Sequence, residues 1–263
     1  MNDSTFIFSF EKNFDFDGVL VWIQTYWTLS FVYVFIYLLL IYLGQRWMQL
    51  RDAFELRTAL ALWSLSLAVF SIFGTCRFLP QIMTEVHQHG FEFTMCDSSS
   101  FKKNLIISFW GWYFAVSKVV ELGDTAFIIL RKQKLVFLHW YHHVTVLVYT
   151  WFAIQELVPS NRWFTLMNLM VHSVMYSYYA FKAMKFKIPR FIAMTITIAQ
   201  LLQMAGGLYV NWRVYSVLAS GRGCGTSMWH IKLAISMYAS YLLLFAHFFY
   251  NSYLKKPMRE KSA

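Results

Sequence analysis

The sequence predicts an all-α integral membrane protein with seven transmembrane helices. Of its 263 residues, 58% are hydrophobic and only 14% are charged, whereas about a quarter of the residues in a soluble domain are charged. Apolar runs of about 20 residues recur, each long enough to cross a hydrocarbon core of roughly 30 Å. They occupy residues 25–44, 57–79, 107–130, 137–156, 163–181, 190–212 and 228–250. Because the connectors are short, we expect residues 1–263 to form one membrane-embedded domain.

The segment before the first apolar run does not resemble a cleaved signal peptide. Residues 1–24 hold Asp3, Glu11, Asp15 and Asp17 against the single basic residue Lys12. A signal peptide begins with a basic stretch and an early apolar core, and both are missing here. The first span is therefore expected to remain as an uncleaved anchor. Asn2 opens an Asn-Asp-Ser glycosylation sequon, which predicts a lumenal N-terminus if it is used.

The net charge of +10 is explained by its placement. If seven spans are correct, the basic residues that follow the first, third, fifth and seventh spans all lie on one side of the membrane. The positive-inside rule assigns that side to the cytosol, so residues 1–24 are expected in the lumen and the basic tail 251–263 in the cytosol. Membrane topology therefore accounts for the charge, and no nucleic-acid partner is expected. The terminal Arg259-Glu260-Lys261-Ser262-Ala263 resembles a dibasic retrieval signal of the endoplasmic reticulum.

Three cysteines fit the same topology. Cys96 and Cys224 fall in the connectors 80–106 and 213–227, both on the non-cytosolic side. In an oxidising lumen we expect them to form a disulfide, with two unpaired thiols as the alternative. Cys76 is expected to serve in helix packing. Since no cysteine falls near the histidines described next, a cysteine nucleophile is excluded there.

Three imidazoles stand inside an apolar span, in His139-Trp140-Tyr141-His142-His143. Their spacing of i, i+3 and i+4 places His139, His142 and His143 on overlapping faces of one helix. Polar, titratable groups at bilayer depth cost several kcal/mol and tend to mark a site of chemistry. The pattern suits a metal cluster or a nucleophile with supporting groups.

Polar residues of four spans fall at one depth. Counting from the basic ends of the spans at 1.5 Å per residue, His139 lies roughly 7 Å deep, Asp124 roughly 10 Å and His142 roughly 12 Å. His172 and Gln200 each lie roughly 15 Å deep. These depths predict a polar chamber that opens toward the cytosol.

The run Lys118-Val-Val-Glu121-Leu-Gly-Asp124-Thr125 supplies the charges of the third span. Lys118, Glu121 and Thr125 share a helix face, and Asp124 adjoins Glu121. Unpaired charges would be costly here, so these residues are expected to pair with each other or with the histidines. Asp124 is expected to fix a histidine tautomer. A purely structural ion-pair network is the alternative.

Two further spans add polar stripes. Asn168, His172, Tyr176 and Tyr179 follow one another on one helix face, although tyrosines near a span end also serve as interfacial anchors. Thr197, Gln200 and Gln203 form a line in the next span, for which helix packing is the alternative.

A metal centre is the main chemical rival. A membrane di-iron oxidase also carries an HxxHH element, but it draws on several such boxes. Here only His139, His142, His143 and His172 lie at the required depth. One zinc ion on three of them stays open as an alternative, since three protein ligands make a catalytic site. We expect no metal.

Five ordered motifs carry a resemblance to a known family. They are the Lys118–Thr125 run, Leu138-His-Trp-Tyr-His-His143, Met167-Asn168 with Val171-His172, Met175-Tyr-Ser-Tyr-Tyr179, and Thr197 with Gln200 and Gln203. Together they resemble the ELO family, the fatty acid elongases or very-long-chain 3-oxoacyl-CoA synthases of the endoplasmic reticulum. Trp140-Tyr141 is similar to the type-six and type-three branch, which acts on saturated and monounsaturated substrates.

The resemblance implies a reaction and a fold. A long-chain acyl-CoA, of about 12 to 18 carbons with a graded preference, condenses with malonyl-CoA to give 3-oxoacyl-CoA, CoA and CO2. No bound cofactor is implied. Spans two to seven would form an inverted barrel around an acyl tunnel. The implied partners are membrane lipid and the 3-oxoacyl-CoA reductase, 3-hydroxyacyl-CoA dehydratase and enoyl-CoA reductase of the cycle, and a homo-oligomer is allowed.

Residue roles follow from the same resemblance. His142 would attack the thioester to form an acyl-imidazole, with His139 and His143 setting its surroundings. His172 would position the reacting groups or remove a proton from them. Asn168 or Gln200 would stabilise the oxyanions that develop during the reaction. The substrate path would be lined by Thr125, Tyr176, Tyr179 and Gln203, and CoA phosphates would meet Lys187, Arg190 and Lys255. A non-enzymatic seven-span receptor and a transporter are the rival classes.

Overall fold

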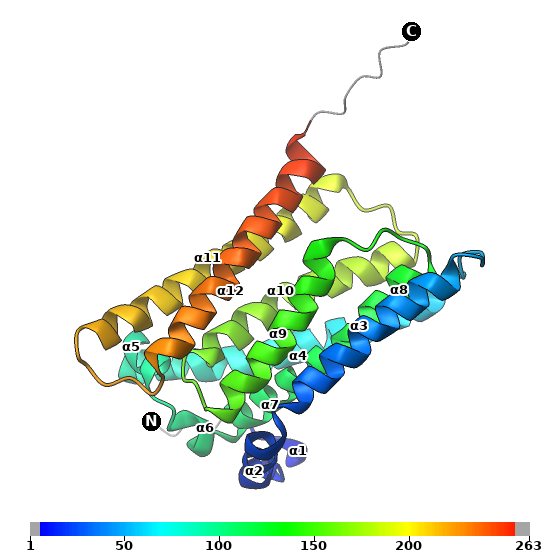
Figure 1. Ribbon diagram of the computed structural model, residues 1–263. Coiled ribbons are helices and arrows are strands. Elements are labelled where there is room, and N and C mark those ends of the chain that lie inside the picture. The colour runs from blue at the N-terminus through cyan, green and yellow to red at the C-terminus, as the bar shows by residue number, and fades with distance from the viewer. Residues whose placement is uncertain (1–5, 256–263) are drawn as a thin grey trace.

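A computed structural model describes residues 6–255, in which every regular element is helical (Figure 1). Short helices α1 (Ser9–Lys12) and α2 (Phe16–Tyr26) precede the long ones. Long helical segments then follow in chain order: α3 (Leu29–Met48), α4 (Arg57–His89), α7 (Leu105–Val120) continued by η1 (Glu121–Gly123) and α8 (Asp124–Leu130), α9 (Phe137–Gln155), α10 (Asn161–Ala183), α11 (Arg190–Ala219) and α12 (Met228–Phe249). Each overlaps one of the predicted apolar runs.

Within residues 6–255, four helices are long and apolar enough to cross a membrane by themselves. They are α3, α4, α11 and the segment Met228–Leu254, which joins α12 to the π-helical turn η2 (Tyr250–Leu254). The all-helical membrane class is thereby confirmed. Successive long segments run in opposite directions (Figure 1). Helix α4 packs along α10, α11 packs along α12, and α3 packs along α8 and α9.

The N-terminal region differs from the predicted first span. The sequence predicts one span over 25–44, whereas the chain forms α2, turns at Trp27-Thr28 and continues as α3 to Met48. The Asp15 side chain caps α2 by accepting a hydrogen bond from the Gly18 N–H at 3.0 Å. Before it, Glu11 is fully buried and accepts from Arg77 at 2.7 Å and from the Trp110 indole at 2.9 Å. These contacts fasten residues 8–13 to α4 and α7.

The third predicted span, 107–130, is not one continuous helix. Asn104 caps α7 through the Ile106 and Ile107 N–H groups, and the helix tightens into η1 at Glu121 before resuming as α8. Gly123 lies in this turn because the Trp63 ring of α4 crosses it. A Cβ at Gly123 would come within 2.7 Å of that ring. Glu121 and Asp124, on either side of this turn, have different partners: Glu121 bonds to Lys118 and Asp124 bonds to Trp63.

The predicted connectors are partly helical. Helix α4 extends to His89 and ends at Gly90, whose φ of 84° suits glycine. Short helices α5 (Phe91–Cys96) and α6 (Ser100–Lys103) follow, and α11 extends to Ala219. In this region Arg162 is fully buried, and its Nη1 donates to Glu85 at 2.5 Å and to Ser100 at 3.1 Å. This ion pair anchors the start of α10 to α4.

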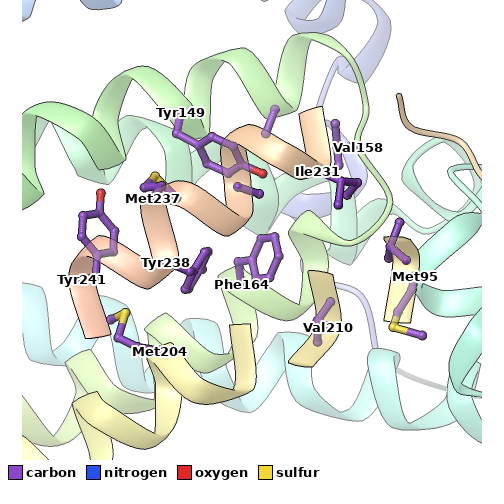
Figure 2. Close-up of a cluster of buried hydrophobic side chains, with 13 residues drawn as sticks. Met95, Tyr149, Val158, Phe164, Met204, Val210, Ile231, Met237, Tyr238 and Tyr241 are labelled. Atoms are coloured by element: carbon purple, nitrogen blue, oxygen red, sulfur yellow. The ribbon is translucent and has the colours of Figure 1, made fainter. Parts of the chain in front are cut away.

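The largest apolar core lies between α9, α10, α11 and α12 (Figure 2). Phe164 and Tyr238 pack with ring centroids 4.9 Å apart, flanked by Tyr149 and Tyr241. Gly207 allows α11 and α12 to approach here, because a Cβ would come within 2.2 Å of the Tyr238 ring. The core thus lies directly beside the histidines of α9.

Candidate active site

A cavity of about 160 Å³ gathers the predicted polar residues from five elements. Its lining comprises Glu121 of η1, Asp124 of α8, His139, His142 and His143 of α9, Asn168, His172, Tyr176 and Tyr179 of α10, Gln200 and Gln203 of α11, and Phe245 and Phe248 of α12. These residues are far apart in sequence, and the packing of the helices brings them to one cavity. Of the predicted site residues, Lys118 and Thr125 lie behind this lining, in contact with it.

The three histidines of α9 have different surroundings. His139 Nε2 lies 2.9 Å from Thr125 Oγ1, and Thr125 Oγ1 is in turn 2.7 Å from the Tyr37 hydroxyl of α3. His143 is buried, and its Nδ1 has no hydrogen-bond partner in residues 6–255. His142 is half-buried against the Tyr241 ring, 5.0 Å between centroids, and none of the recorded hydrogen bonds engages its ring. Among the residues that the structure describes, His142 and His143 both line the cavity without a hydrogen bond to their rings, and His142 is the more exposed of the two.

Lys118 and Glu121 form a buried ion pair beneath the cavity. Lys118 Nζ donates to Glu121 Oε1 at 2.7 Å, and both side chains are almost fully buried. Ser117 Oγ also donates to Glu121 Oε1, at 3.0 Å. The ammonium group therefore offsets the carboxylate charge, which would otherwise be costly in an apolar medium.

Asn168 and His172 close a ring with this pair. Lys118 Nζ donates to Asn168 Oδ1 at 2.8 Å, which leaves the Asn168 amide nitrogen as a donor. That nitrogen lies 3.1 Å from His172 Nε2, so Nε2 accepts and the ring proton resides on Nδ1. Nδ1 in turn lies 3.6 Å from Glu121 Oε1. The four side chains therefore fix a neutral tautomer of His172.

Asp124 does not take the role expected for it. Its Oδ1 accepts from the Trp63 indole at 2.6 Å, and its Oδ2 accepts from the Tyr176 hydroxyl, also at 2.6 Å. The groups that contact histidines are instead Thr125, beside His139, and Glu121, beside His172. Asp124 thus joins α4, α8 and α10 at the wall of the cavity.

A hydroxyl network holds the outer face of α9. Thr145 Oγ1 donates to the Tyr141 carbonyl oxygen at 2.7 Å and lies 2.6 Å from the Tyr241 hydroxyl. The Tyr141 hydroxyl lies 3.0 Å from Ser240 Oγ. These contacts tie α9 to α12 within one turn of His142.

A second, smaller cavity continues inward from His142. Its volume is about 20 Å³, and it shares His142, Asn168, Gln203 and Met204 with the first cavity. Beyond them it is lined by aromatic and apolar residues of the core in Figure 2: Tyr149, Phe164, Met237, Tyr238 and Tyr241. The polar chamber thus leads into an apolar interior.

Of the remaining predicted residues, Lys187, Arg190, Thr197 and Lys255 lie outside the cavity, whereas Gln200 lines it. Lys187 and Lys255 are exposed, and Arg190 donates to the Ser252 carbonyl oxygen at 2.6 Å. Thr197 Oγ1 lies 3.4 Å from the Tyr253 hydroxyl, and Gln200 Nε2 lies 3.4 Å from Met175 Sδ. The cations therefore stand at the ends of α10, α11 and α12, away from the imidazoles.

The structure joins Cys96 and Cys224 in a disulfide, with the sulfurs 2.07 Å apart. This bond ties α5 to the connector between α11 and α12. Cys76 is exposed rather than packed, contrary to expectation. Asn2 and the retrieval-like terminus lie outside the described residues. Within residues 6–255, no group of three His, Cys, Asp or Glu side chains is arranged to hold a metal ion.

Sequence reasoning missed the aromatic partners of the site. Trp63, Tyr37 and Tyr241 come from α4, α3 and α12, and each lies in an apolar run where an aromatic residue is ordinary. Thr145 carried a local signal, because it follows His142 by three residues on the same helix face. The other three had none.

The chain is similar to known proteins along most of its length. Residues 22–261 match the family model ELO: GNS1/SUR4 family. Over 252 residues the chain is 47% identical to very long chain fatty acid elongase 6 of Drosophila melanogaster, covering 95% of this chain and 80% of that protein. It is 43% identical over 256 residues to the Homo sapiens protein of the same name, covering 97% and 96%.

A second human relative extends the comparison. Very long chain fatty acid elongase 3 of Homo sapiens is 44% identical over 239 residues, covering 91% of this chain and 88% of that protein. The family model and these relatives span nearly the whole chain, including every residue of the cavity. The chain therefore belongs to the ELO family, as its five motifs predict.

Proposed function

We propose that this protein is the condensing enzyme of fatty acid elongation in the endoplasmic reticulum membrane. It joins a saturated or monounsaturated acyl-CoA, of about 12 to 18 carbons with a graded preference, to malonyl-CoA. The products are 3-oxoacyl-CoA, CoA and CO2. The ELO match and relatives named very long chain fatty acid elongases support this class of reaction.

One observation carries the mechanism: the cavity holds imidazoles and no thiol. His142 faces the cavity, whereas two of the three cysteines form a disulfide and the third, Cys76, is exposed and is not among the lining residues. An acyl group that must be activated there has a histidine ring nitrogen as its available nucleophile. The ring of Lys118, Glu121, Asn168 and His172 keeps His172 neutral and directed at the same space.

The first half-reaction transfers the acyl group to His142. A ring nitrogen attacks the thioester carbonyl carbon, the C–S bond breaks, and CoA leaves as the thiol after taking up the ring proton. The Asn168 amide retains a second N–H, and Gln200 and Gln203 supply others, to stabilise the oxyanion. An acyl-imidazole hydrolyses readily, so Phe245 and Phe248 at the cavity wall would limit the access of water.

The second half-reaction forms the new carbon–carbon bond. Malonyl-CoA loses CO2, and the electron pair of the broken C–C bond becomes an enolate. The enolate carbon attacks the acyl carbon, and the bond to the His142 nitrogen breaks. His142 leaves as the imidazolate and takes up one proton from solvent, which restores the neutral ring, and 3-oxoacyl-CoA leaves. During both steps the acyl tail is directed toward the smaller apolar cavity, whose side chains must move apart to hold it. Lys187, Arg190 and Lys255 attract the CoA phosphates.

The proposed topology places all seven long segments across the bilayer. Segments two to seven surround the tunnel, with the N-terminus in the lumen and the C-terminus in the cytosol. The basic ends of α3, α8, α10 and α12 then share the cytosolic side, and the disulfide lies in the oxidising lumen. The 3-oxoacyl-CoA reductase, 3-hydroxyacyl-CoA dehydratase and enoyl-CoA reductase of the cycle would act on the product.

The test uses purified protein with labelled malonyl-CoA and palmitoyl-CoA. We expect CO2 release and a 3-oxoacyl-CoA two carbons longer, both lost in His142→Ala. His89→Ala, at the exposed end of α4, is the matched control and keeps full activity. The preference for chain length is expected to be graded, so the assay is repeated with acyl-CoA substrates of about 12 to 18 carbons. Absence of product with every one of them would contradict the proposal. Loss of activity on chelation with recovery on adding zinc would favour the metal alternative.

A further inference from the structure

An apolar groove lies between α3 and α8, apart from the histidine cavity. Its volume is about 390 Å³. Gly44 and Ala126 leave it hollow, and the surrounding side chains are mostly aliphatic. The Tyr37 hydroxyl, a polar group of the lining, is already bonded to Thr125 at 2.7 Å. The groove therefore offers apolar surface and suits a hydrocarbon.

The groove runs along the membrane-spanning helix α3. Its lining extends from Tyr33 to Gly44, which is about 16 Å along the helix axis. Ile36 and Leu40 on its rim are 44% and 61% exposed, so it opens outward to the lipid. A groove of this length with an apolar lining suits one extended hydrocarbon chain, and the charges that follow its end favour a lipid over an apolar helix of a second copy.

Two cations follow the end of the groove. Leu130 lines that end and is followed by Arg131 and Lys132. The two helix ends are joined, because Lys132 Nζ lies 3.5 Å from the Gln49 carbonyl oxygen. Neither cation takes part in an ion pair within residues 6–255. A basic rim beside an apolar groove matches an amphiphile with an anionic head group.

We propose that this groove binds one acyl chain of an anionic phospholipid of the bilayer, with its phosphate at Arg131 and Lys132. The apolar lining accommodates the chain, and the two cations supply charge-assisted hydrogen bonds to the phosphate. This site is distinct from the acyl-CoA path, because the lining of the groove and the lining of the histidine cavity have no residue in common. Binding here is independent of whether the protein condenses acyl-CoA.

The test uses the full-length protein in nanodiscs of phosphatidylcholine and phosphatidylserine, one of the two carrying a diazirine on an acyl chain. After photolysis, we expect the cross-links from phosphatidylserine to concentrate in peptides of α3 and α8. Ala126→Phe and Leu40→Trp fill the groove and should abolish them. Leu243→Phe, on the 72%-exposed lipid face of α12, is the matched control and should keep them.

Removal of rim charge tests the head group. Arg131→Gln should lower the preference for phosphatidylserine over phosphatidylcholine about five-fold, the effect of one basic residue at a membrane surface. Leu40→Trp keeps the test informative if Ala126→Phe fails to fold. Three results would overturn the proposal. Cross-links could survive both groove-filling substitutions, they could spread evenly over the lipid-facing helices, or they could form equally with phosphatidylcholine. A Leu40→Cys protein that forms disulfide-linked dimers through α3 in the nanodisc would also overturn it.

Discussion

The Asn168 amide nitrogen lies 3.1 Å from Nε2 of His172, and this contact sets the protonation of the site. Because Lys118 occupies the Asn168 carbonyl oxygen, the amide group must present its N–H to the imidazole. The His172 proton then lies on the side of Glu121. An asparagine between a lysine and a histidine thus relays the orientation of a buried ion pair to an imidazole at the cavity.

Breaking the buried ion pair should destabilise the protein strongly. Lys118→Met or Glu121→Gln leaves one charge unpaired and should lower the free energy of unfolding by about 3–5 kcal/mol. The double variant removes both charges, so it should recover most of this loss. Thermal unfolding in detergent measures all three. A double variant as unstable as the sum of the two single variants would contradict the account.

The hydroxyl of Thr125 should matter to the reaction. Thr125→Val removes the group between Tyr37 and His139, and leaves His139 Nε2 without its partner. A lost buried hydrogen bond of about 1 kcal/mol corresponds to roughly five-fold in kcat. Thr125→Ser, which retains the hydroxyl, is the matched control. Equal kcat for the two variants would show that His139 needs no such contact.

The inner cavity should set the preferred acyl length. Met237→Ala enlarges the space beyond His142 and should shift the products toward longer chains, with a stability cost of about 2–5 kcal/mol. Product analysis with a mixture of acyl-CoA substrates measures the shift. Leu233→Ala, an exposed change on the same helix, should leave the distribution unchanged. A Met237→Ala protein with the wild-type distribution would place the acyl path elsewhere.

Acid should loosen the N-terminal segment through Glu11. Burial acts to raise the pKa of Glu11, but the hydrogen bonds from Arg77, Trp110 and the Phe8 N–H, with the charge of Arg77, outweigh it, and the net pKa lies below its usual range. The folded pKa is thus below the unfolded one, so Glu11 stabilises the fold above the unfolded pKa. That contribution disappears as the pH falls through the folded value.

Thermal midpoints across pH test this expectation. Glu11→Gln should lower the midpoint at neutral pH and flatten its acid dependence. Glu92→Gln is the matched control, because Glu92 pairs with Arg222 at an exposed site where an ion pair contributes little. If both variants behave alike, Glu11 does not hold the segment.

Much of the site was predictable because its signals are local. The helical spacing of His139, His142 and His143 predicts that they lie together on one helix. The distances of His172 and Gln200 from the basic ends of their spans predict that they lie at the same depth. The partners of Asp124 were not predictable, since nothing marks Trp63 among other apolar residues. The anchor between Glu11 and Arg77 joins residues 66 apart, which no periodicity reveals. Helix α2 is shorter than a membrane span, so a search for apolar runs of about 20 residues does not predict it.

The acylation of His142 is the central claim, and one measurement tests it most directly. Protein is incubated with palmitoyl-CoA alone, and its peptides are examined by mass spectrometry while released CoA is counted. The account predicts a palmitoyl adduct on His142, with CoA released in proportion to enzyme before malonyl-CoA is added, and neither in His142→Ala. Wild-type protein that turns over normally, yet shows no adduct and releases no CoA until malonyl-CoA arrives, would contradict it.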